Sequence, residues 1–449
     1  MPPAALAGGG LLRVLGVGFG LAVIIGNTIG AGILRTPGDV ARYLPNPVWF
    51  LGVWVLGGLY ALLGAFSLSE LGAMMPRSGG YYVFARRGLG EFAGFTVGWT
   101  DWLAQCGTTA AVAIVIAGYA GELLPLLARH TVFLAATVTI AVALLQWHGI
   151  RAGSMTQNIT SLLKTLAFVA VVAAAFWFRH PLAKIAAAGP APDAHPLWVA
   201  VLLALQAVIY TYDGWYGVIY FGEEVRNPAR DIRRSMVFGV LALMAIYLLV
   251  NIALLHVLPM SAIAGQTMAL GTAAAAIFGS RGQTILQALM ILSMLSGINA
   301  YHLMASRIPF AMSQDGLLSH QVSRVNPGGT PTAGLFLSTL LALGFILGGK
   351  RFETVLAMTA FYFVADYAMA YTAVFVLRRR EPDAPRPYRA WGYPWSTGLA
   401  LLGSVAFLIA IVMEDTRNSV YALLSLAMSY PLYRLTRVLL RRGGNDRNP

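Results

Sequence analysis

The sequence predicts an all-α membrane protein with about twelve transmembrane helices in one compact domain. Of its 449 residues, 58% are hydrophobic and only 11% are charged, whereas a soluble domain carries about 25% charged residues. Apolar runs of about 20 residues, long enough to cross a bilayer as a helix, recur along the whole chain. Glycine and polar residues interrupt two of these runs near their middle, which indicates more than simple anchoring.

The apolar runs define the expected spans. They cover approximately residues 13–43, 47–74, 91–120, 131–150, 155–179, 198–222, 235–258, 282–312, 332–348, 353–378, 396–413 and 418–440. Segment 261–280 is too broken to span and too apolar for a free loop, so we expect an outer re-entrant or surface-lying lid. Residues 379–395, rich in Pro and Arg, are expected to form a cytoplasmic loop, and residues 1–12 and 441–449 cytoplasmic tails.

The formal net charge of +13 follows from membrane orientation. With these spans, the even-numbered connections and both tails lie on one side, which holds 21 of the 31 Lys and Arg residues. Cytoplasmic loops of membrane proteins carry such an excess, so both termini are expected in the cytoplasm. The basic character therefore gives no reason to expect nucleic acid as a partner.

Motifs for enzymatic chemistry or metal binding are missing from the sequence. The stretch "GLGEFA" (Gly88–Ala93) has the letters of a dinucleotide-binding loop, but no strand precedes it and an expected membrane helix follows. The seven histidines lack metal-ligand spacing, and no phosphate-binding loop occurs. We therefore expect no enzyme, no cofactor and no metal site. Cys106, the single cysteine, lies inside a span, which argues against a disulfide-linked accessory subunit.

The first span has an unusual centre, "IIGNTIGAGIL" (Ile24–Leu34). Glycine is about 1 kcal/mol worse than alanine inside a helix, and unpaired backbone groups are costly in hydrocarbon. If the helix unwinds at Thr28–Gly32, its second half begins with free N–H groups and partial positive charge, which attract a carboxylate. Gly30 and Gly32 would let a ligand approach the backbone closely.

The sixth span is interrupted in the same way by Asp213 and Gly214, within "YTYDGWYGVIY". Spans one and six hold corresponding places in two five-helix halves, residues 13–180 and 198–378, and the second half enters the membrane from the opposite side. Paired interruptions are the sequence sign of an inverted-repeat transporter with a mid-membrane binding site.

Residues at the second interruption allow several roles. Free carbonyls there would accept hydrogen bonds from an ammonium group, so that the two breaks together suit a zwitterion; these carbonyls belong to Tyr210, Thr211 and Tyr212. Asp213, a carboxylate at membrane depth, would bind a cationic substrate end, titrate, or pair with a structural partner. Tyr210, Trp215 and Tyr216 would line the pocket, act as a gate, or simply pack.

Lys164 is the only lysine placed within a span. An ammonium group at this depth is costly and is a functional residue by default. It would supply a fixed or protonatable positive charge where sodium-coupled transporters hold their ion, or pair with helix-end carbonyls without a transport role. At the cytoplasmic end of the sixth span, Glu223 and Glu224 are expected to form a gate with Arg86, Arg87 or Arg230.

Four segments resemble the amino acid–polyamine–organocation (APC) superfamily, and most closely its L-type amino acid transporter branch and bacterial relatives. They are "IIGNTIGAGILRTPG", "SELGAMMPRSGGYYVFARRGLG", "YTYDGWYGVIYFGEEVRNPARDI" and "SRIPFAMSQDGLL". The resemblance covers nearly the whole chain. It implies a LeuT-like five-plus-five inverted repeat with discontinuous first and sixth helices, two added helices over 396–440, and sodium-independent amino acid transport by alternating access.

The resemblance also implies roles for individual residues. Lys164 is expected to bridge the first helix and the eighth near Ser293 or Ser296, and Tyr210 falls at an aromatic gating position. The substrate carboxylate is expected at Gly30, Ala31 and Gly32, and the ammonium group at the carbonyls of Tyr210, Thr211 and Asp213. Ala31 departs from the serine of many members, and Tyr216 from the asparagine of several L-type members.

Together these observations predict a bacterial inner-membrane carrier of small or neutral L-amino acids, either an exchanger or a proton-linked transporter. The bulk of Tyr216 favours small side chains. Two alternatives stay open. One is a carrier of cationic amino acids or polyamines that uses Asp213 as counter-charge, and the other is a sensor that binds an amino acid without moving it.

Overall fold

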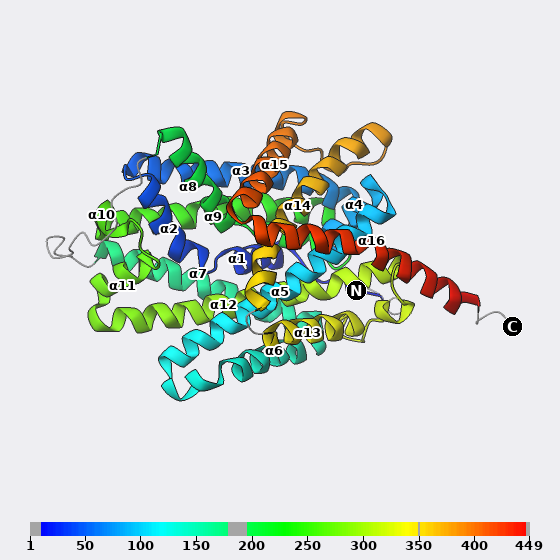
Figure 1. Ribbon diagram of the computed structural model, residues 1–449, viewed down its shortest axis with the longest axis horizontal. Coiled ribbons are helices and arrows are strands. Elements are labelled where there is room, and N and C mark those ends of the chain that lie inside the picture. Colours follow the sequence, from blue (N-terminus) through cyan, green and yellow to red (C-terminus); the bar gives the residue numbers. More distant parts are fainter. Residues whose placement is uncertain (1–9, 178–194, 349–350, 446–449) are drawn as a thin grey trace, which may run out of the picture.

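The fold is a bundle of long helices. The computed structural model describes residues 10–177, 195–348 and 351–445. The named elements in these ranges are all helices. Three isolated β-bridges pair residues that lie outside the helices. Figure 1 shows helices α10 (Met260–Ile263) and α11 (Ala269–Phe278) at one end of the bundle and the end of α16 (Thr416–Asn445) at the other.

Within the described ranges, eight helices are long and apolar enough to cross a membrane, or nine if one bent pair counts as a single span. The eight are α3 (Pro47–Met74), α5 (Glu91–Leu123), η1–α6 (Pro125–Trp147), α7 (Ile150–Trp177), α9 (Pro228–Val257), the α11–α12 segment (Ala269–Gln314), Met358–Arg380 of α14, and α15 (Trp395–Glu414). Shorter apolar helices are α8 (Leu197–Tyr212) and α13 (Thr332–Leu347). The expected all-helical, multi-span architecture is confirmed, while the count of twelve spans stays a prediction.

Local sequence chemistry explains where several helices begin. The helix α3 covers Pro47–Met74, the range expected from its apolar run. Asn46 caps it, because the Asn46 side chain accepts a hydrogen bond from the Val48 backbone N–H at 2.9 Å, and Pro47 occupies the first turn. Both are favoured helix-start residues because they satisfy or remove N–H groups that have no partner in the helix. The last helix, α16, covers Thr416–Asn445.

Both expected interruptions are present. The helices α1 (Val17–Thr28) and α2 (Gly32–Tyr43) meet at an angle of 53°. The helix α8 ends at Tyr212 and is followed, after a turn, by the 3-10 helix η3 (Gly217–Tyr220). Gly214 lies in this turn with φ of +107°, a backbone conformation that glycine adopts without strain.

Two segments that were not expected to span have helices of their own. The helix α4 (Tyr81–Leu89) lies in the first expected cytoplasmic loop, between Gly80 and Gly90, which both have positive φ. Its nine residues are too few to cross a bilayer. The expected lid contains α10, α11 and the short η4 (Gly279–Arg281).

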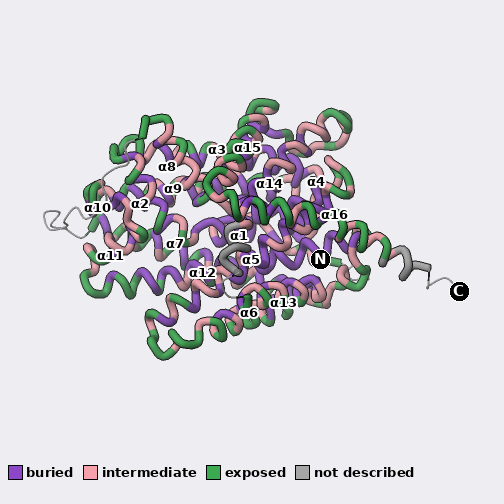
Figure 2. Tube along the Cα trace, viewed as in Figure 1, coloured by how far each residue is buried: buried purple, intermediate pink, exposed green. Residues whose placement is uncertain are grey.

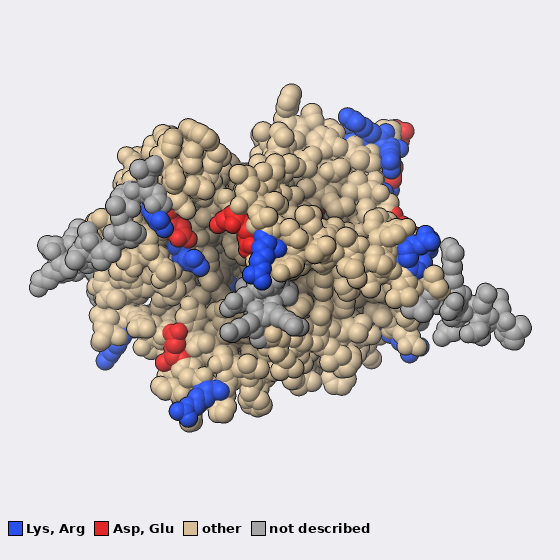
Figure 3. Space-filling model, viewed as in Figure 1, with Lys and Arg blue, Asp and Glu red and all other residues tan. Residues whose placement is uncertain are grey.

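The buried centre of the bundle is formed by α5, α12 (Gly282–Gln314) and α14 (Arg351–Arg380), whereas α6 (Thr131–Trp147) lies at the periphery (Figure 2). In the most apolar window of each segment, 78% of the α11–α12 residues are buried but only 11% of those in η1–α6. The exposed residues of α6 are mostly apolar, which suits contact with lipid tails. Uncharged side chains also cover most of the face in Figure 3.

Candidate functional site

The first break exposes backbone to the space between the helices. Residues between Thr28 and Gly32 are not helical, and α2 begins without a side-chain cap. The first N–H groups of a helix have no acceptor inside it, so those of α2 are available to a ligand. Ala31 is exposed, and Gly30 and Gly32 are half-exposed. This geometry is suited to holding an anion.

Lys164 fixes the end of α1. Its Nζ donates to the carbonyls of Gly26 at 2.9 Å and Ile29 at 2.7 Å, and its side chain is fully buried. Ser293, on α12, donates its hydroxyl to the same Ile29 carbonyl at 2.8 Å. The lysine therefore contacts helix-end carbonyls directly and meets α12 through an acceptor that it shares with Ser293.

Ser296 lies one turn further along α12 and belongs to a neighbouring network. Its hydroxyl is 2.8 Å from that of Ser161, which donates to the Ala22 carbonyl at 2.7 Å. Gln157 donates to both Ala22 and Ser296. These side chains approach closely because Gly26 has no Cβ: a Cβ there would lie 2.8 Å from the Ser161 hydroxyl. The network holds α1 against α7 and α12.

Two side chains tie the two breaks together, and a third binds the first break. The Tyr247 hydroxyl, on α9, lies 3.1 Å from the Thr28 carbonyl and 2.9 Å from the Thr211 carbonyl, and donates to both. Asn27 donates its Nδ2 to the Gly214 carbonyl at 3.1 Å. Tyr301, on α12, donates to the Asn27 carbonyl at 3.3 Å. These side chains were not among the predicted site residues, since their signal in the sequence is a polar group within an apolar run.

The residues around the second break differ in exposure. Tyr210 is 53% exposed, whereas Trp215 is 4% and Tyr216 0% exposed. Tyr210, Asp213 and Trp215 line a cavity of about 20 Å³, which has room for about one water molecule. No Lys or Arg in the described ranges forms an ion pair with Asp213. Asp213 therefore borders a small space without a cationic partner.

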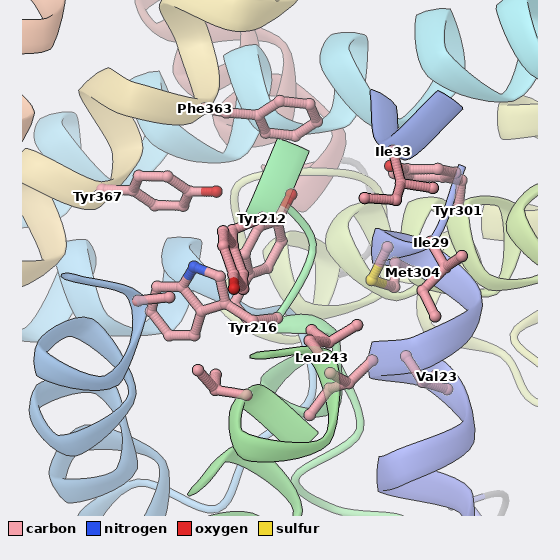
Figure 4. Close-up of a cluster of buried hydrophobic side chains, with 14 of the residues drawn as sticks. Val23, Ile29, Ile33, Tyr212, Tyr216, Leu243, Tyr301, Met304, Phe363 and Tyr367 are labelled. Atoms are coloured by element: carbon pink, nitrogen blue, oxygen red, sulfur yellow. The ribbon is translucent and has the colours of Figure 1, made fainter. Parts of the chain in front are cut away.

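Buried aromatic side chains pack around the second break. Tyr212 donates its hydroxyl to the Trp54 carbonyl at 3.1 Å and packs its ring against Tyr247. Tyr216 packs against Tyr81 of α4 and Tyr367 of α14. Figure 4 shows Tyr212, Tyr216 and Tyr367 beside labelled side chains from the α1–α2 break, α9, α12 and α14. Tyr212 and Tyr216 are thus packing residues in this conformation, while Tyr210 faces open space.

The ion pairs beyond this aromatic layer correct the expected gate. Glu224 pairs with Arg307 of α12 at 2.9 Å, and both are fully buried, whereas Glu223 accepts a hydrogen bond from the Ser78 backbone N–H. The expected arginine partners bind elsewhere: Arg86 to Asp315, Arg87 to Glu381 and Arg230 to Asp231. The hydrogen bond from Arg87 lowers the pKa of the Glu381 carboxyl. The expected pairing was wrong because Arg86, Arg87 and Arg230 each have another acidic partner. Arg307 of α12 reaches Glu224 instead.

The arrangement offers backbone donors at one break and one carboxylate beside the carbonyls of the other. Of these carbonyls, those of Tyr210 and Thr211 already accept one hydrogen bond each. No group of three or more metal-ligating side chains occurs in the described ranges. Such a site can orient a small zwitterion by its two ends, but it holds no nucleophile or acid–base pair arranged for catalysis.

Comparison with known proteins agrees with this chemistry. A model of the amino acid permease family matches residues 19–430. The chain belongs to the amino acid permease family. As a member of this family of transporters within the APC superfamily, it is a multi-span membrane protein and not an enzyme.

Individual relatives cover nearly the same length. The chain is 29% identical over 433 residues to a serine/threonine exchanger, SteT, of Bacillus subtilis, covering 94% of this chain and 97% of the relative. It is 28% identical to the branched-chain amino acid permease BcaP of the same organism, over 87% of this chain and 86% of the relative. It is 24% identical to the b(0,+)-type amino acid transporter 1 of Mus musculus, over 84% and 79%.

Proposed function

We propose that this permease is a sodium-independent secondary transporter of small neutral L-amino acids that works by alternating access. The observation that carries the proposal is the α1–α2 break, whose exposed amides suit a substrate carboxylate and whose geometry Lys164 and Ser293 fix. The similarity to a serine/threonine exchanger along almost the full length supports exchange and a small substrate.

The proposed substrate pose uses both breaks. The carboxylate lies at the amides of Gly30, Ala31 and Gly32, and the ammonium group at the carbonyls of Tyr210, Thr211 and Asp213. Thr28 borders the pose through its carbonyl, which Tyr247 binds. Tyr210 covers the pocket as a gate, since it is the exposed aromatic residue beside it. Trp215 lines the pocket, and Tyr216 packs against Trp215.

The proposed architecture has twelve spans in the LeuT-like arrangement. Residues 13–180 and 198–378 are the two inverted repeats, and 396–440 add two helices. Both termini lie in the cytoplasm of a bacterial cell whose inner membrane holds the protein. The arginine-rich cytoplasmic connections support this orientation, as does the position of the lid helices at the end of the bundle opposite the end of α16 (Figure 1).

The test is uptake of radiolabelled serine and alanine into sodium-free proteoliposomes at two external pH values, with and without internal amino acid. Uptake that requires internal amino acid identifies an exchanger. Uptake into empty vesicles that rises at acid pH identifies proton coupling. If substrate binds but no counterflow occurs in either condition, the protein is a sensor and the proposal of transport is wrong.

A second candidate, transport of cationic amino acids or polyamines, is favoured by Asp213. This carboxylate lines the cavity without a described cationic partner, so it is free to bind a positively charged substrate end. Asp213→Asn should then abolish arginine or polyamine uptake and spare alanine uptake. Equal losses for arginine and alanine would count against a counter-charge role.

A further inference from the structure

A second cavity lies outside the substrate site, where α7 begins. Its volume is about 350 Å³, and one face of α7 provides most of its lining. Residues three or four apart share a helix face, which is the spacing of Arg151, Ser154, Met155, Asn158 and Ile159. The remaining lining residues, Val14 and Arg226, come from two other segments.

Backbone pairing sets the far wall of this cavity. The Leu15 N–H donates to the Glu224 carbonyl at 2.9 Å, and the Arg226 N–H donates to the Leu15 carbonyl at 2.8 Å. This short parallel bridge holds the segment before α1 beside the segment after η3. Val14 and Arg226 therefore face α7 from a fixed frame, and the cavity has three walls.

The cavity is positively charged. Arg151 and Arg226 are both exposed, and neither forms an ion pair with an acidic side chain in the described ranges. Glu223 and Glu224, the acidic residues nearest to Arg226 in the sequence, bind the Ser78 N–H and Arg307, respectively. Ser154 and Asn158 add hydrogen-bonding groups. Two unpaired guanidinium groups with neutral donors beside them match a phosphate group, which arginine binds in a bidentate manner.

An apolar strip leads away from the cavity along the same side of α7. Met155 is 64% exposed and Ile159 46%, and the strip continues with Leu162 at 59% and Leu166 at 55%. These residues follow helical spacing, so they form a continuous ridge on the outside of the bundle. A ligand with a phosphate at one end and hydrocarbon chains at the other fits both features, whereas free phosphate would leave the strip uncovered.

We propose that this cavity binds the headgroup of an anionic phospholipid, with the phosphate between Arg151 and Arg226 and the acyl chains along α7. Basic pockets between helices on the cytoplasmic side recognise such headgroups. The bound lipid joins α7 to the segment before α1, and so stabilises the conformation in which these two elements lie together.

The test is native mass spectrometry of the full-length protein in detergent, titrated with short-chain phosphatidylglycerol. A parallel titration uses phosphatidylcholine of the same chain length. A second experiment adds inorganic phosphate as a competitor of bound phosphatidylglycerol. Each arginine near a lipid phosphate adds a modest attraction, so Arg151→Gln and Arg226→Gln should each weaken phosphatidylglycerol binding about fivefold, and the double variant about thirtyfold. The matched control is Arg324→Gln with Arg434→Gln, which removes two exposed arginines outside the cavity.

The outcomes separate the sources of the phosphate. Loss of phosphatidylglycerol binding in the double variant but not in the control, with little binding of phosphatidylcholine, supports the proposal. Displacement of the lipid by millimolar inorganic phosphate would mean that the cavity takes free phosphate, and would overturn the lipid assignment. Equal binding by the double variant, the control and the unaltered protein would show that the cavity is not the binding site.

Discussion

Replacing Lys164 with Met tests whether the end of α1 must be fixed for transport. Methionine keeps a long unbranched side chain in the buried space but removes the Nζ donor. The Gly26 carbonyl then loses a hydrogen bond of 2.9 Å and the Ile29 carbonyl one of 2.7 Å. The Ile29 carbonyl keeps the hydrogen bond from Ser293. The larger loss is therefore at the Gly26 carbonyl, which is left without its hydrogen bond from Lys164.

The size of the effect follows from these contacts. A buried carbonyl left without a partner costs about 1–3 kcal/mol, and the lost bond at Ile29 adds about 1 kcal/mol. The break in its observed position is therefore destabilised by about 2–4 kcal/mol relative to displaced arrangements. Since 1.4 kcal/mol is tenfold in an equilibrium, the apparent kcat/KM for serine uptake should fall about 30- to 700-fold.

The assay is initial serine uptake into proteoliposomes with matched protein content, alongside thermal unfolding in detergent. Thr165→Ala is the control, because Thr165 neighbours Lys164 but its hydroxyl donates to the Ser161 carbonyl within the same helix. Thr165→Ala should stay within about fivefold of the unaltered protein, since removing about 1 kcal/mol of hydrogen bonding inside α7 corresponds to at most that factor. Uptake by Lys164→Met within the same range, in a folded protein, would refute the reasoning.

Two further substitutions test packing around the site. Gly26→Ala should lower the melting temperature and serine uptake, because the new Cβ meets the Ser161 and Ser296 hydroxyls at 2.8 and 2.5 Å and overpacking costs about 1–3 kcal/mol. The control Gly18→Ala, whose Cβ would meet nothing within 4 Å, should leave both unchanged. Equal effects of the two substitutions would argue against steric conflict at Gly26. Arg307→Met should destabilise the protein by about 3–5 kcal/mol, because it leaves the buried Glu224 carboxylate unpaired. Adding Glu224→Leu to Arg307→Met should restore most of that loss in thermal unfolding, and a double variant as unstable as the single one would contradict the ion-pair account.

The helices and their interruptions are readable from the sequence because short-range effects decide them. Apolar runs must be about 20 residues long to span hydrocarbon, and Asn46 with Pro47 marks the start of α3 by local hydrogen bonding and dihedral restriction. Gly30 and Gly32 lower the helix stability of the first span locally, and this effect does not depend on which other helices pack against it. The expectation of two broken helices, and of backbone groups freed there, follows from these facts alone.

The partners of polar groups in this bundle depend on which helix faces lie together, and the sequence gives no direct measure of that. Glu224 bonds to Arg307, 83 residues away, rather than to the arginines that precede or follow it more closely. The Tyr247 hydroxyl joins two breaks that are far apart in the chain. In a uniformly apolar helix the hydrophobic pattern does not select one face, so packing decides which side chain reaches a freed carbonyl. The sequence by itself determined where the backbone opens; the tertiary structure decided which residues hold it open.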